Sequence, residues 1–112
     1  MKSYPSLPSD KKLKVVCRIE PGSLGPDGAG VVSEFCQFAQ GQVAMYDVGF
    51  MSWEILPRVD KSLPEIEYRV GNKNLNHSYA SRYLNAFDMD IDTFEADASD
   101  RLTDLIMEFV NQ

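Results

Sequence analysis

The chain has 112 residues, of which 44% are hydrophobic and 25% are charged, and its formal net charge at pH 7 is −6. This length suits one domain with a core of its own and excludes two. The acidic balance, without a stripe of lysine and arginine, excludes nucleic acid as an expected partner, because affinity for it depends on neutralising phosphates. No run of about 18 apolar residues is present and the first residues lack the apolar stretch of a secretory signal, so we expect a soluble cytoplasmic protein without a membrane partner.

Residues 1–11 contain prolines, few apolar groups and no periodicity, so we expect a flexible N-terminal arm ahead of a single domain over residues 12–112. Residues 13–20 then alternate between apolar and mostly polar side chains, as a half-buried strand does. The apolar face of this predicted strand consists of Leu13, Val15, Cys17 and Ile19.

A glycine-rich turn follows the first strand and leads into a predicted helix. Pro26 suits the first position of that helix, because its ring fixes a helical φ angle. The predicted buried stripe consists of Val32, Phe35, Cys36 and Ala39. Gly41 is a natural stop, but apolar residues continue the stripe beyond it, so we favour a helix that runs through Gly41 and ends near Met45.

Two further strands are predicted in the middle of the chain. Residues 50–58 alternate in the pattern of a strand, and Pro57 places the end of that strand at an edge of the sheet. A loop over residues 59–64 separates it from a second alternating segment at 65–70. Because two such segments joined by a short loop are typical of a hairpin, we expect them to pair in the antiparallel direction.

The last third of the chain is predicted to be helical. Gly71 and Asn72 mark a turn, and Asn76 is expected to cap a second helix. Asp92 and Glu95 have the spacing of a capping box, which predicts a third helix that runs to the end of the chain. The resulting order, β-α-β-β-α-α, favours an α+β fold in which a three-stranded sheet carries its helices on one face.

The sheet face that the helices leave uncovered is the first candidate site. Its predicted members are Val16, Arg18, Glu54, Leu56, Arg58, Glu67 and Arg69, with Lys14 beside them. Two apolar groups among mixed charges suit a recognition patch or a dimer interface, with arginine as the expected anchor. The alternative is cross-strand charge pairing that only keeps the face polar.

The glycine-rich turn, Gly22–Gly30, is the second candidate site. Gly28 and Gly30 match the start of a dinucleotide fingerprint, but that fingerprint follows its strand at once and here six or more residues intervene. Backbone N–H groups of Gly25, Gly28 and Gly30 at a helix start would still suit a small anion or a phosphate-bearing metabolite. The alternative is a turn with a structural role only.

No catalytic set is apparent in the sequence. Cys17 and Cys36 fall on apolar faces, where a thiol behaves as an inert hydrophobe, and with the single His77 they lack the spacing of metal ligands. We therefore expect no catalytic residue, metal or cofactor. The predicted function is a noncatalytic interaction or regulatory module for another protein or a second copy of the chain. It would use the uncovered sheet face or the acidic last helix.

Overall fold

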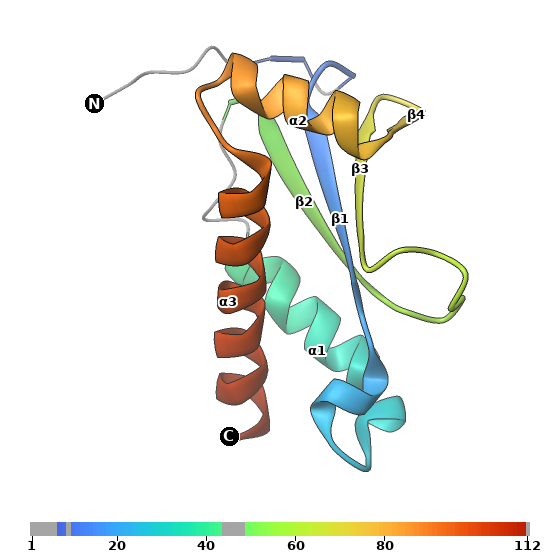
Figure 1. The fold of residues 1–112 in the computed structure, drawn as a ribbon. Helices are drawn as coiled ribbons and strands as arrows, with labels where there is room; N and C mark the ends of the chain where they lie inside the picture. Colours follow the sequence, from blue (N-terminus) through green and yellow to red (C-terminus); the bar gives the residue numbers. More distant parts are fainter. Residues whose placement is uncertain (1–6, 9, 44–48, 112) are drawn as a thin grey trace.

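A four-stranded mixed sheet with the strand order β2-β1-β3-β4 forms the centre of the fold (Figure 1). The computed structural model describes residues 7–8, 10–43 and 49–111, and all four strands lie within these ranges. Strand β1 (Leu13–Ile19) pairs in parallel with β2 (Met51–Pro57) and in antiparallel with β3 (Ile66–Val70). A short strand, β4 (Lys73–Leu75), pairs with β3 at the far edge.

The helices surround one face and one end of this sheet. A 3₁₀ turn, η1 (Pro21–Leu24), leads from β1 into α1 (Gly28–Val43), which crosses back to β2. Helix α2 (His77–Ala86) lies across the end of the sheet near β4, and α3 (Ile91–Val110) packs against α1, which runs obliquely to it (Figure 1). Apolar side chains of these helices enclose the core face of β1.

The α+β class is therefore confirmed, whereas the strand count is wrong. The predicted sheet of three strands lacks β4, and the order β-α-β-β-α-α omits both β4 and η1. β4 has only three residues and only Leu75 among them is apolar, so it shows no periodicity that a sequence pattern can detect. Its pairing depends on the turn at Gly71, where φ is +61° and glycine carries no steric cost.

The predicted hairpin between residues 50–58 and 65–70 is wrong. β2 and β3 lie on opposite sides of β1, so Leu13 stands between Met51 on one side and Val70 on the other. The physical reason is the burial of β1, which is buried at six of its seven positions and so belongs in the centre of a sheet. The parallel pairing of β1 with β2 also requires a crossover, which α1 supplies.

Helix α1 runs through Gly41, as predicted. It begins at Gly28 instead of Pro26, because the residues just before it form a tight turn in which the N–H of Gly28 donates to the carbonyl of Gly25 at 3.0 Å. The predicted end near Met45 lies outside the described residues, which resume at Gly49.

The described part of the predicted N-terminal arm contacts the domain. The N–H of Leu7 donates to the carbonyl of Gly49 at 2.8 Å, and the side chain of Leu7 packs against the core. The hydroxyl of Tyr83 donates to the carbonyl of Lys11 at 2.9 Å. These contacts join residues at the start of the chain to Gly49, just before β2, and to α2.

The two later helices begin with side-chain caps. Asn76 caps α2 as predicted, since its Oδ1 accepts the N–H of Tyr79 at 2.8 Å. The predicted capping box of α3 at Asp92 and Glu95 is wrong by two residues: Asp90 is the N-cap and accepts the N–H of Thr93. The carboxylate of Glu95 instead accepts a hydrogen bond from the hydroxyl of Tyr68 in β3.

Replacing Asn76 with alanine should lower the free energy of unfolding by about 1 kcal/mol, because one N–H at the start of α2 loses its acceptor. Urea denaturation measures the change. Asn74→Ala is the matched control, since Asn74 is exposed in β4 and caps no helix. An equal loss in both variants would contradict the capping role.

Candidate functional site

The structure brings most of the predicted surface residues together on the sheet face that points away from the core. Val16 of β1 lies opposite Glu54 of β2 and Glu67 of β3, and Arg18 lies opposite Leu56. Val16 is fully buried but is not part of the apolar core between sheet and helices, which places it on the other side of the sheet. We call this side the open face; its members are Val16, Arg18, Glu54, Leu56, Arg58, Glu67 and Arg69.

A buried ion pair occupies the middle of the open face. Nη1 of Arg18 lies 3.3 Å from Oε1 of Glu67, and the two side chains are only 6% and 9% exposed. The second carboxylate oxygen of Glu67 accepts the Nε–H of Arg69. Arg18 also donates to the carbonyl of Pro64 at 3.0 Å. Arg18 therefore stabilises the sheet and the chain that follows β2, and little of it remains accessible to a partner.

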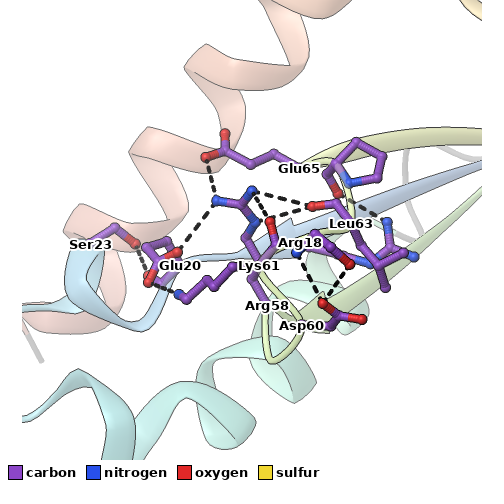
Figure 2. Close-up of polar contacts among 10 residues, drawn as sticks. Arg18, Glu20, Ser23, Arg58, Asp60, Lys61, Leu63 and Glu65 are labelled. Carbon is purple, nitrogen blue, oxygen red and sulfur yellow. Dashed lines mark hydrogen bonds and ion pairs between the residues drawn. The ribbon is translucent and has the colours of Figure 1, made fainter.

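Arg58 has a comparable role at the end of β2 (Figure 2). Its guanidinium donates to the carbonyl of Leu63 from Nε at 3.3 Å and from Nη2 at 3.2 Å, and to the carbonyl of Lys61 at 3.3 Å. Nη1 lies 3.6 Å from Glu20 and 3.5 Å from Glu65. Arg58 thus binds the backbone of its own loop, and a charge reversal at this position would release that loop.

The loop between β2 and β3, residues 58–65, is also held by its own side chains. Oδ1 of Asp60 accepts hydrogen bonds from the N–H of Ser62 at 2.9 Å and from the hydroxyl of Ser62 at 2.7 Å. These bonds hold the pKa of Asp60 below its usual range. Lys61 pairs with Glu20, and this contact lowers the pKa of the Glu20 carboxyl (Figure 2). The loop has no helix or strand of its own, yet polar contacts fix its path.

Exposed apolar side chains lie at the same end of the sheet. Val59 is 85% exposed, Leu63 is 38% exposed and Leu56, at the end of β2, is 37% exposed. We call these residues the loop-end patch. Exposed apolar groups beside paired charges on a fixed loop are typical of a recognition surface.

The glycine-rich turn uses its donors internally. The N–H of Gly25 donates to Gly22, that of Gly28 to Gly25 and that of Gly30 to Asp27, at 3.3, 3.0 and 3.0 Å. An anion at this helix start would need such N–H groups. The described geometry therefore favours the structural alternative for the turn over an anion site.

The two cysteines are free and buried. Burial raises the pKa of Cys17 to about 12 and that of Cys36 to about 11, so neither forms much of the nucleophilic thiolate at neutral pH. Cys36 borders an open hollow of about 440 Å³ between α1 and β2. Gln40 crosses this region and bonds the Trp53 carbonyl at 2.9 Å and the Ile55 N–H at 2.8 Å, which satisfies part of the edge of β2.

Comparison of the chain with protein-family models, curated proteins and solved structures found no match. Within the described ranges, no helix is both long enough and apolar enough to cross a lipid bilayer.

Sequence reasoning missed two members of the loop-end patch, Val59 and Leu63, because alternation assigns a face only to strand residues. One signal was present: two apolar residues stand in a loop segment that is otherwise polar. The sequence gives no signal for the carbonyl groups that accept hydrogen bonds from Arg18 and Arg58, since every residue has a backbone carbonyl.

Proposed function

We propose that this chain is a noncatalytic protein-interaction module that binds another protein through the loop-end patch and the charges around it. The observation that carries the proposal is the exposure of Leu56 at the end of β2 and of Val59 and Leu63 on the following loop, whose backbone is already held by Arg18 and Arg58. A fixed loop loses little conformational freedom on binding, so the burial of these side chains is not offset by a large ordering cost.

The chemistry of the patch defines the partner. Exposed groups of both signs alternate with the apolar residues along the loop, with Lys61 58% and Glu65 67% exposed at the side chain. Such an arrangement suits a protein surface that places apolar side chains at the centre and charges of both signs at the rim. The small size of the patch favours a transient complex. We also propose a cytoplasmic location, which the two free cysteines support because free thiols suit a reducing compartment.

Val59→Asp tests the proposal, because the side chain is almost fully exposed and its replacement leaves the loop contacts intact. The variant should capture the partner at least about tenfold less well than the natural chain, since a carboxylate would have to be desolvated at the centre of the interface. Quantitative affinity capture followed by mass spectrometry measures the loss. Sedimentation of the natural chain alone reports whether the captured partner is a second copy.

The matched control is Val110→Asp, the same substitution at an exposed valine near the end of α3. A partner retained by this control and lost from Val59→Asp supports the proposal. Equal capture by all three proteins would remove the loop-end patch from consideration.

A further inference from the structure

Three potential metal ligands meet where α2 and α3 begin. His77 is the first residue of α2, and Asp92 and Glu95 lie in the first two turns of α3. One ligand atom from each of the three side chains lies within 4.8 Å of the other two. These residues are up to 18 positions apart in the sequence, so only the packing of the two helices brings them together.

The donor set is mixed, because it combines an imidazole nitrogen with oxygens of two carboxylates. Zn²⁺ binds both of these ligand types, and a site with three protein ligands leaves a position for water. Hard cations such as Mg²⁺ and Ca²⁺ prefer oxygen alone. The imidazole therefore favours a transition metal over the hard cations.

A hydrogen bond from the sheet orients one of the carboxylates. The hydroxyl of Tyr68, a buried residue of β3, donates to Oε2 of Glu95 at 2.6 Å. This bond leaves the other carboxylate oxygen of Glu95 for a ligand. Metal-binding carboxylates are commonly held by such outer hydrogen bonds, which fix their direction.

The geometry requires a small closing movement. Ligand atoms that bind Zn²⁺ at about 2.0–2.2 Å lie about 3–3.5 Å from one another. This distance is less than the 4.8 Å within which the three ligand atoms of the cluster lie. His77 and Asp92 are exposed, so rotation of their side chains can close the gap. The positive ends of both helices oppose a cation, and the two carboxylates offset this effect.

We infer that His77, Asp92 and Glu95 form a binding site for a divalent transition metal, with Zn²⁺ as the preferred ion. Bound metal would join the start of α2 to the start of α3. The site lies on elements other than the loop-end patch, and this inference does not depend on the proposed interaction function.

Titration of the full-length chain with ZnCl₂ in a calorimeter tests the site. The natural chain should bind one equivalent with a dissociation constant below about 100 μM. His77→Ala and Asp92→Asn should each weaken binding at least about tenfold, because each removes one ligand from a set of three. Both residues are exposed at helix starts, and circular dichroism checks that the variants are folded.

Asp97→Asn is the matched control, since it removes an exposed carboxylate of α3 that is not part of the cluster. It should bind Zn²⁺ as the natural chain does. Saturating Zn²⁺ should also raise the melting temperature of the natural chain and of Asp97→Asn but not that of His77→Ala. Absence of binding, or equal affinity in His77→Ala, would overturn the inference and leave only general attraction of cations to an acidic surface.

Discussion

Replacing Gly28 with alanine should lower the free energy of unfolding by about 3 kcal/mol. A Cβ at this position would lie 1.8 Å from the carbonyl oxygen and 2.8 Å from the carbonyl carbon of Pro21. Both are backbone atoms of η1, so no side-chain rotation relieves the clash and η1 must move away from α1. Overpacking of a buried contact typically costs about 1–3 kcal/mol, and a backbone obstacle places this variant at the upper end.

Two glycines of the same helix provide the controls. Gly30 and Gly41 have no atom within 4 Å of an added Cβ. Alanine is favoured over glycine by about 1 kcal/mol inside a helix, so Gly30→Ala and Gly41→Ala should raise the stability. Urea denaturation of the three variants therefore gives effects of opposite sign. Gly28→Ala with natural stability would show that η1 does not pack closely on α1.

The sequence predicts local features well because their causes are local. The alternation in β1, the continuation of α1 through Gly41 and the cap at Asn76 each depend on a few neighbouring residues. The pairing of strands depends on distant residues. The sequence pattern does not reveal that Val16 and Arg18 are buried on the second face of β1. This burial is what suits the strand to its place between β2 and β3.

Less of the candidate sites than of the local structure could be predicted, because the sites also depend on residues that are distant in the sequence. Alternation places Arg18 and Glu67 on one face, and the structure pairs them. The proximity of His77 to Asp92 and Glu95 could not be predicted, because it depends on the angle between two helices and on the turn that joins them. Helical periodicity describes each helix separately and contains no information about that angle.

Loss of one partner from the Arg18–Glu67 pair should be strongly destabilising. In Glu67→Leu the guanidinium of Arg18 remains buried without its carboxylate, and we expect the free energy of unfolding to fall by about 3–4 kcal/mol. The control is Glu54→Leu on the same face, where the side chain is only partly buried and the expected change is about 0.5 kcal/mol or less. Similar losses in both variants would show that the pair has no special role.

The double variant Arg18→Leu/Glu67→Leu separates two effects on the free energy of unfolding: the contribution of the ion pair itself and the cost of leaving one charge buried without a partner. It should be destabilised by less than the sum of the single variants, because no uncompensated charge of the pair remains in the sheet. Arg18→Leu alone has a further effect, since the carbonyl of Pro64 loses its donor. Amide hydrogen exchange over residues 59–65 should therefore accelerate in Arg18→Leu and much less in Glu67→Leu. If exchange accelerates equally in both, the loop is held by the sheet as a whole and not by the contact between Arg18 and Pro64.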